Sequence, residues 1–419
     1  MTKNANFAKV QIIFSLNFPY FLAKRMLFTG NRTFSKLIVR VTIGALALAI
    51  SAIILSVAIL KGFKTEIIEK QRGFFGDIII TKNDLNASYE NTPIKLLEQD
   101  IKHIKGVPWV REITPFATKA GIMNVKGEVE GVLLKGVDKT YNQQYIKPNI
   151  IKGDTLNFGE SATTQLLISE YLASRLSLDV GDKFIMYFVQ DPIRKRPFSI
   201  RGIYTTHSEE LDKTYVIGSL DLIRRLNDLD DTDVGAYQIR ISNFDSLQVA
   251  TQQIADLLPI EMNATNIVEQ MPDIFNWLNM LDMNDNIIFV LMMLVAIINM
   301  VSSLLISILE RSAMIGVLKA LGYVNTGIRK VFLYGSMYLI GLGLLIGNGI
   351  ALLLYVFQTQ THFFALDPST YYIEYVPMQI HWYQVVGLNV AVAVIGLMAL
   401  FIPAMLISRI SPIKTIQFK

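Results

Sequence analysis

The sequence predicts a membrane protein with four transmembrane helices and a large extracytoplasmic α+β domain between the first and the second helix. Three observations support this fold class. Of the 419 residues, 52% are hydrophobic and only 18% are charged. The apolar residues are concentrated in four runs, each long enough to cross a bilayer. The long stretch between the first two runs instead shows the short periodic patterns of a water-soluble domain.

The four apolar runs cover residues 41–60, 287–309, 331–357 and 385–407. The first, VTIGALALAISAIILSVAIL, has twenty residues and no charge, and an α-helix of that length spans about 30 Å, one hydrocarbon thickness. None of the four runs contains Asp, Glu, Lys or Arg. Because ion-coupled carriers usually keep ionisable groups near the middle of the membrane, the sequence disfavours that class of transporter.

The basic residues predict the orientation of the chain. Residues 1–40 contain seven Lys or Arg and no acid, so the positive-inside rule makes this segment cytoplasmic. Alternation then gives an extracytoplasmic domain, a cytoplasmic loop, an outer loop and a cytoplasmic tail, at residues 61–283, 310–327, 358–384 and 408–419. Within the N-terminal segment, residues 17–27 mix aromatic and basic side chains. They are expected to form an amphipathic interfacial helix, or an ordinary helix before the span.

The extracytoplasmic domain is expected to be α+β, without internal repeats. Strands are predicted at residues 76–81, on both sides of Lys126-Gly127, and at 196–206, 213–218 and 236–242. Helices are predicted at residues 170–176, 219–227 and 245–258, and a further helix starts near Pro272 and continues into the second span. One more helix is expected from Thr92 to Ile104, with Thr92 as its N-cap and Pro93 in its first turn.

Several kinds of chemistry are absent from the sequence. There is no Cys, which excludes thiol catalysis, Cys-based zinc sites and disulfides. No G-x-x-x-x-G-K-[ST] motif is present, so this chain is not expected to hydrolyse ATP. The Asp-rich stretch 228–233 lacks the Gly and Glu of a calcium loop, and no metal site or cofactor is expected. A net charge of +4 is too small to indicate a nucleic-acid partner.

Two short patterns are candidates for specific roles. Gly343 and Gly347 are four residues apart in the third run, a spacing that suits close helix packing. The segment between the second and third runs, ILERSAMIGVLKALG, has the pattern of a short amphipathic helix. Its Ile315, Leu318 and Leu321 recur at helical spacing and could fill a groove on another protein. Its charged residues Glu310, Arg311 and Lys319 remain available for polar contacts.

This segment, together with the arrangement of four spans and a large domain after the first, resembles the type VII ABC transporter permeases. This is the group of FtsX, MacB and LolC/LolE. ERSAMIGVLKALGY is similar to the loop that follows the second span in that family. SVAILKGFKTEI, YYIEYVPMQIHW and FIPAMLISRISPIKTIQF are similar to LolC/LolE motifs at the other spans. The resemblance implies a MacB-like periplasmic domain and an inner-membrane location. It also implies that residues 310–327 form a coupling helix seated on a separate ATPase subunit. The implied coupling residues are Glu310, Arg311, Ile315, Gly316, Leu318, Lys319, Leu321 and Gly322.

The resemblance further implies a permease, not an enzyme, that extracts lipoproteins from the inner membrane by mechanotransmission. A LolD-like ATPase would bind ATP and Mg²⁺, a LolA-like periplasmic carrier would receive the lipoprotein, and a second permease subunit, identical or paralogous, would complete the complex. Membrane lipids are expected partners, and nucleic acid is not. The resemblance places a cargo cavity between the first and second spans of paired subunits. Its candidate lining residues are Met292, Met293, Ile297 and Met300, because Met adapts to irregular apolar cargo.

Alternatives remain open at this point. A MacB- or FtsX-like mechanotransmitter would drive efflux or a cell-wall hydrolase without moving lipid cargo. A receptor with four anchors and no ATPase is a further possibility. The methionines are explained equally well by helix packing, by contact with lipid, or by a cargo cavity. The basic turn at residues 189–197 is either a solvated hairpin tip or a docking loop for an acidic partner.

Overall fold

The computed structural model describes residues 18–28, 33–84, 90–158, 164–367, 371 and 373–409. The tail expected at 408–419 and the first seventeen residues thus lie almost wholly outside the described residues. The chain divides into two compact units. The helical unit comprises Met1–Phe63, Asn279–Phe364 and Val376–Lys419, and the sheet unit comprises Lys64–Leu278 and Ala365–Tyr375.

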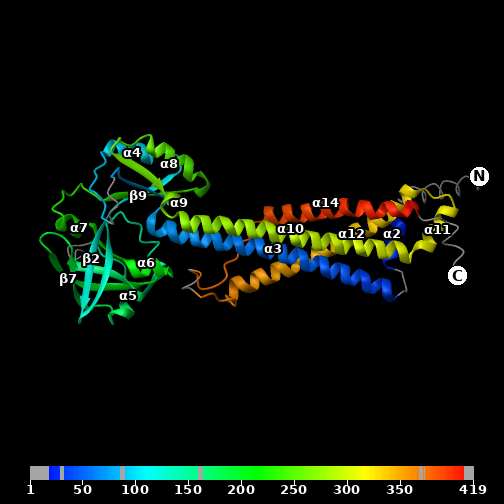
Figure 1. Cartoon of the computed structure of the whole chain (residues 1–419), viewed down its shortest axis with the longest axis horizontal. Helices are drawn as coiled ribbons and strands as arrows, with labels where there is room; N and C mark the ends of the chain where they lie inside the picture. The colour runs from blue at the N-terminus through cyan, green and yellow to red at the C-terminus, as the bar shows by residue number, and fades with distance from the viewer. Residues whose placement is uncertain are drawn as a thin grey trace, which may run out of the picture. The chain divides into compact units, whose positions relative to one another are not determined.

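Four long helices in the described part of the chain are apolar enough to cross a membrane (Figure 1). They are α3 (Thr33–Phe75), α10 (Pro272–Glu310), α12 (Asn325–Thr361) and α14 (Trp382–Ala404). Each contains one of the predicted apolar runs, except that the 3₁₀ helix η4 (Met405–Arg409) completes the fourth. The described part of the helical unit also contains two shorter helices, α2 (Phe18–Phe28) and α11 (Ser312–Ala320). The fold class predicted from the sequence is confirmed for the membrane helices.

Small residues let the membrane helices pack closely. A Cβ atom built on Gly347 would lie 2.8 Å from the Ala47 carbonyl oxygen and 3.0 Å from Ile50, so α12 lies directly against α3 there. Gly343 contacts Leu46 of α3 in the same way, at 2.6 Å. Between α12 and α14, the amide nitrogen of Asn348 donates to Asn389 at 2.7 Å, and that of Asn389 donates back at 3.0 Å. A reciprocal amide pair satisfies polar groups that lipid could not satisfy.

Ten strands form one sheet in the described part of the sheet unit. They are β1 (Ile78–Lys82), β2 (Val110–Val125), β3 (Glu128–Val137), β4 (Ile150–Gly153), β5 (Gln165–Ser169), β6 (Lys183–Phe188), β7 (Arg194–Tyr204), β8 (Tyr215–Ser219), β9 (Ala236–Ile241) and β10 (Met262–Asn266). The order is β10-β1-β9-β2-β3-β8-β5-β7-β4, and β6 pairs with β2 and β7. The predicted turn at Lys126-Gly127 joins β2 to β3, and both residues have positive φ, 51° and 96°, as a tight hairpin turn requires.

Short helices accompany the strands. They are α4 (Glu98–Lys105), η1 (Lys147–Asn149), α5 (Glu170–Arg175), α6 (Glu209–Thr214), α7 (Leu220–Leu226), η3 (Phe244–Ser246), α8 (Leu247–Ala255) and α9 (Ile267–Gln270). The helix expected from Thr92 is wrong in its first half, because α4 begins only at Glu98. Upstream of α4, Ile94 exchanges backbone hydrogen bonds with Val234, 2.8 and 3.0 Å long. This pairing holds the segment in an extended conformation.

Candidate functional site

The segment between the second and third spans is a compact helix with a defined end. Helix α10 ends at Glu310, and α11 begins directly after Arg311. At the other end, the Tyr323 N–H donates to the Leu318 carbonyl oxygen at 2.9 Å, and Gly322 has a φ of +83°. This is the Schellman arrangement, in which glycine at the left-handed position stops the helix. Gly322 therefore fixes the length of α11 at the cytoplasmic position predicted for the coupling segment.

The exposed side of α11 is not the one that the helical spacing suggested. Ile315 is 0% exposed and belongs to the core of the helical unit, and Leu318 packs against the same core. Gly316 is also buried. In contrast, Val317 is 50% exposed and Leu321 is 79% exposed. The expectation that Ile315 faces a partner is therefore wrong in this structure. Leu318 is half-buried and Leu321 is exposed, so partner contacts through these two residues stay a prediction.

The basic residues of this segment hold the helix to its own chain. The Arg311 guanidinium donates to the Met26 carbonyl oxygen of α2 at 2.9 Å. The Lys319 ammonium donates to the carbonyl oxygens of Ile407 and Ser408 in η4, at 2.7 and 3.2 Å. Burial, together with nearby Arg329, lowers the pKa of Lys319. Arg311 and Lys319 thus tie α11 to α2 and η4. Glu310 is half-buried at the end of α10.

The candidate cavity residues on α10 lie mainly inside the helical unit. Met293 and Met300 are buried in its core, and Ile297 is partly buried against that core. A Cβ built on Gly396 would meet the Met300 methyl group at 2.7 Å, so Met300 fills the space beside α14. Met292 is half-buried. Met293 and Met300 therefore act as packing residues in this structure, and the expectation that they line a cavity is wrong for it.

A different stripe of α10 is open. Among the exposed apolar side chains of α10, four recur every three or four residues and share one face of the helix. They are Ile287, Leu291, Leu294 and Ile298, and Ile288, Val290 and Val295 are exposed beside them. The sequence pattern did not single out this stripe, because the whole run is apolar and its periodicity is weak. Only the packing of α3, α12 and α14 shows which side of α10 remains uncovered.

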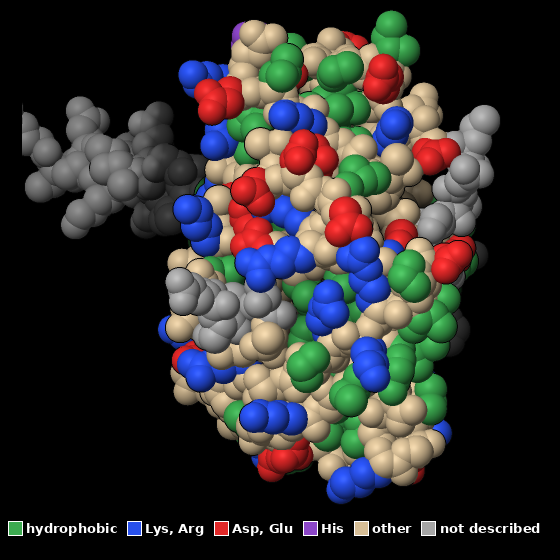
Figure 2. Space-filling model, turned by 90° about the vertical axis from the view of Figure 1, so that its left-hand side faces the viewer, with side chains coloured by type: hydrophobic (Ala, Val, Ile, Leu, Met, Phe, Trp, Pro, Cys, Tyr) green, Lys and Arg blue, Asp and Glu red, His purple; other side chains and the backbone are tan. Residues whose placement is uncertain are grey.

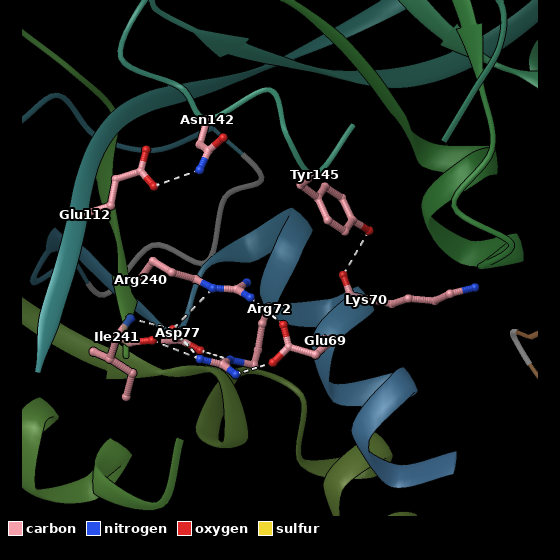
Figure 3. Close-up of polar contacts among 9 residues, drawn as sticks. All are labelled: Glu69, Lys70, Arg72, Asp77, Glu112, Asn142, Tyr145, Arg240 and Ile241. Atoms are coloured by element: carbon pink, nitrogen blue, oxygen red, sulfur yellow. Dashed lines mark hydrogen bonds and ion pairs between the residues drawn. The ribbon is translucent and has the colours of Figure 1, made fainter. Parts of the chain in front are cut away.

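The sheet unit holds the outer end of α3 through a buried ion-pair network (Figure 3). Asp77 is 0% exposed. The Arg72 guanidinium binds the Asp77 carboxylate through two nitrogens and also donates to the Ile241 carbonyl oxygen at 3.1 Å. The Ile241 N–H donates to Asp77 at 2.7 Å. Glu69 bridges Arg72 and Arg240. Bidentate pairing with matched hydrogen bonds is the arrangement that makes a buried ion pair tolerable.

Phe244 connects the outer end of α3 with the first turn of α10 inside the sheet unit. The Arg72 guanidinium carbon lies 4.9 Å from the centre of the Phe244 ring. On α10, Phe275 stacks with Phe244 at a centroid distance of 6.2 Å and an interplanar angle of 13°. We call Arg72, Asp77, Phe244 and Phe275 the outer clamp. The acid–base pattern of the sequence did not reveal it, because its members come from three distant segments.

A buried lysine lies beside the same end of α3. The Lys135 ammonium of β3 donates to the Phe74 carbonyl oxygen and to Gln238 Oε1, the latter at 3.0 Å. It also lies 4.6 Å from the Phe74 ring centre and 5.0 Å from that of Phe116. Burial lowers the pKa of Lys135 from 10.5 to about 7. A cation here caps the last carbonyls of α3 and complements its dipole.

The basic hairpin exists, but its first arginine turns back onto the domain. Strands β6 and β7 pair up to Phe188 and Arg194. The Arg194 guanidinium binds Asp228 at 2.6 Å and donates to the Leu226 carbonyl oxygen at 2.8 Å. Val189 and Ile193 at the tip are exposed. Across the face of the sheet unit in Figure 2, acidic and basic side chains are interspersed. A role of the hairpin in docking stays a prediction.

Comparison with known families gives two matches that together span most of the chain. Residues 41–257 match the MacB-like periplasmic core domain family, and residues 286–412 match the FtsX-like permease C-terminal family.

Among curated proteins, the chain is 20% identical to the lipoprotein-releasing system transmembrane protein LolC of Neisseria meningitidis, covering 92% of this chain and 95% of LolC. It is 19% identical to the lipoprotein-releasing system transmembrane protein LolE of Haemophilus influenzae, over 96% and 100% of the two chains.

Among solved structures, the periplasmic region of MacB from Actinobacillus actinomycetemcomitans is 15% identical, with a TM-score of 0.34, over 50% of this chain and 98% of that one. The two family matches follow the boundary between the domain after the first span and the remaining spans. The chain therefore belongs to the type VII ABC transporter permeases, multi-pass proteins of the inner membrane in which a MacB-like periplasmic core domain precedes an FtsX-like permease region.

Proposed function

We propose that this chain is a permease subunit that extracts lipoproteins from the inner membrane for release to a periplasmic carrier. The observation that carries the proposal is the full-length similarity to LolC and LolE, both named as parts of lipoprotein-releasing systems. A separate ATPase subunit would bind ATP and Mg²⁺ and supply the energy. A second permease subunit, identical or paralogous, would complete the complex, and both chain termini would lie in the cytoplasm.

The chemistry of the cargo explains the apolar surface of α10. Each buried methylene of an acyl chain contributes about 0.8 kcal/mol, so a lipid anchor cannot be exposed to water at an acceptable cost. The permease must therefore offer an apolar surface along the whole path. The stripe of Ile287, Leu291, Leu294 and Ile298 is exposed on α10 and carries no polar side chain. We assign the cargo-facing surface to this stripe, in place of the buried Met293 and Met300.

The ATPase would bind α11 through its exposed apolar residues, Val317 and Leu321. Since Arg311 and Lys319 tie α11 to α2 and η4, a push on α11 would move the cytoplasmic ends of several helices together. This supports a mechanism of two discrete states whose balance ATP shifts.

The test uses the permease reconstituted in nanodiscs with its ATPase, a fluorescent lipoprotein and the soluble carrier. Leu321→Asp is expected to abolish ATP-dependent transfer to the carrier while the permease stays folded, because Leu321 is 79% exposed. Leu321→Met is the matched control and should transfer normally. Full transfer by Leu321→Asp would contradict the assignment of this surface.

A second candidate function is a mechanotransmitter that moves no lipid cargo. It is favoured by the outer clamp, which fastens both α3 and α10 to the sheet unit and would serve any periplasmic effector. Purification of the complex followed by mass spectrometry separates the two. Lipoprotein cross-linked to α10 supports extraction, and its absence, with an intact ATPase complex, supports the mechanotransmitter.

A further inference from the structure

The sheet unit contains a groove that none of the roles above uses. It has a volume of about 730 Å³, within the range of ligand-binding sites. Its walls come from the last turn of α3, from α6 and from the first turn of α10, and its floor comes from β2, β3 and the start of β8. All of these residues belong to the sheet unit.

The floor of the groove includes an unpaired strand edge. Along β3, the stretch Leu133–Val137 pairs with β8, but in the described structure Glu128–Val132 has a strand neighbour only on the β2 side. Gly131 lies in this unpaired stretch and lines the groove, and a Cβ built there would meet no atom within 4 Å. Glycine at an open strand edge allows another backbone to approach closely. An extended segment could therefore add to β3 in line with β8.

A buried acceptor in the groove wall lacks a donor. Gln71 lines the groove and is 4% exposed, and its Oε1 has no hydrogen-bond partner among the described residues. A buried unsatisfied carbonyl is costly, so such groups normally find a partner. Once the Gln71 amide turns toward the groove, a backbone N–H of a bound segment would supply the missing donor, because Oε1 is itself buried in the unbound chain.

The charge of the groove specifies the segment further. Its lining includes the carboxylates of Glu210 and Asp273, and the described lining residues include no Lys, Arg or His. Apolar side chains such as Val132 and Ile274 complete the wall. The acidic rim favours a ligand with basic side chains.

We propose that this groove binds an extended, basic polypeptide segment by strand addition to β3. We identify the segment as the stretch of cargo polypeptide next to the lipid anchor. This identification rests on the proposed function.

The test measures fluorescence anisotropy of the full chain in nanodiscs with a fluorescein-labelled nine-residue peptide of alternating Ser and Lys. A peptide of alternating Ser and Glu is the charge control. Gly131→Leu places a branched side chain in the open space of the groove next to the unpaired edge and should abolish binding of the basic peptide. Gln71→Leu should weaken it about three- to tenfold, the effect of one hydrogen bond. Val249→Leu, exposed on α8 and outside both the groove lining and β3, should leave binding unchanged.

The inference is overturned if Gly131→Leu binds the basic peptide as wild type does, or if the acidic peptide binds equally well. It is also overturned if a photoreactive lipid in the nanodisc labels the groove and the peptide does not compete. Lipoprotein transfer by the same variants separates this inference from the proposed function. Peptide binding without any transfer by the wild type contradicts the proposed function alone, and normal transfer by Gly131→Leu contradicts the identification of the segment as cargo.

Discussion

The buried ion pair of Arg72 and Asp77 is expected to contribute strongly to the stability of the sheet unit at the outer end of α3. Replacing Arg72 by Met would remove the bidentate guanidinium partner of the fully buried Asp77 carboxylate and leave it only Arg240, 3.9 Å away. Removing one partner of such a pair costs about 3–5 kcal/mol. We expect Arg72→Met to lower the thermal midpoint of the purified chain strongly.

Arg175→Met is the matched control, because Arg175 pairs with Glu130 on the surface and is 64% exposed. It should change the midpoint little. A small effect of Arg72→Met, similar to that of the control, would show that the buried network does not stabilise the sheet unit.

Lys135 makes stability depend on pH in a defined direction. Its folded pKa of about 7 lies below the ordinary value of 10.5. Between these values the unfolded chain holds a proton that the folded chain has lost, so raising the pH favours the folded state. The free energy of unfolding of the wild type, relative to Lys135→Met, should therefore rise between about pH 7 and pH 10 and stay constant below pH 7. Chemical denaturation across this range measures it, and a pH-independent difference would refute it.

At the residue scale, the sequence predicted the short helix between the second and third spans but not which of its side chains are buried. Helical spacing placed Ile315, Leu318 and Leu321 on one side, and the structure divides that side between core and solvent. Hydrophobic periodicity indicates that a helix has an apolar face. It does not indicate whether that face is covered by the same chain or by a partner. The same limit applies to Met293 and Met300 in a run that is apolar all round.

The next scale is that of the helices and strands, where glycine controls how α12 approaches α3. Gly347→Ala would bring a methyl group to 2.8 Å from the Ala47 carbonyl oxygen, so the two helices must separate. Overpacking of this kind costs about 1–3 kcal/mol. Gly349→Ala, two residues further along α12, meets nothing within 4 Å and should be neutral or slightly stabilising. Thermal midpoints in detergent compare the two, and equal midpoints would contradict close packing at Gly347.

Helices and strands could be predicted from the sequence where neighbouring residues determine the local conformation. The positive-φ turn at Lys126-Gly127 and the strands beside it follow from turn chemistry and alternation. Thr92 and Pro93 are an equally good local signal for a helix start, yet α4 begins at Glu98. There, backbone pairing of Ile94 with Val234, far along the chain, outweighs the local preference. The ten-stranded order of the sheet likewise depends on distant pairings that no single-chain pattern contains.

For the molecule as a whole, the proposed orientation across the membrane can be tested directly. The chain has no cysteine, so single introduced cysteines report their own location. Ile260 is 97% exposed in the sheet unit, and Leu321 is exposed on α11. In spheroplasts, a membrane-impermeant maleimide should label Ile260→Cys and should label Leu321→Cys only after the membrane is opened. External labelling of Leu321→Cys would reverse the proposed topology.

The proposed mechanism depends on the outer clamp, because α3 and α10 are each one uninterrupted helix with residues in both units. Motion of either helix can act on the sheet unit only if its outer end is held there, and Phe244 contacts both ends. Phe244→Ala should therefore reduce lipoprotein transfer while ATP hydrolysis by the reconstituted complex continues. Tyr171→Ala, an exposed aromatic of the same unit, should preserve both activities. If Phe244→Ala transferred cargo at the wild-type rate, force would have to reach the sheet unit by another route, and the outer clamp would be a stabilising contact only.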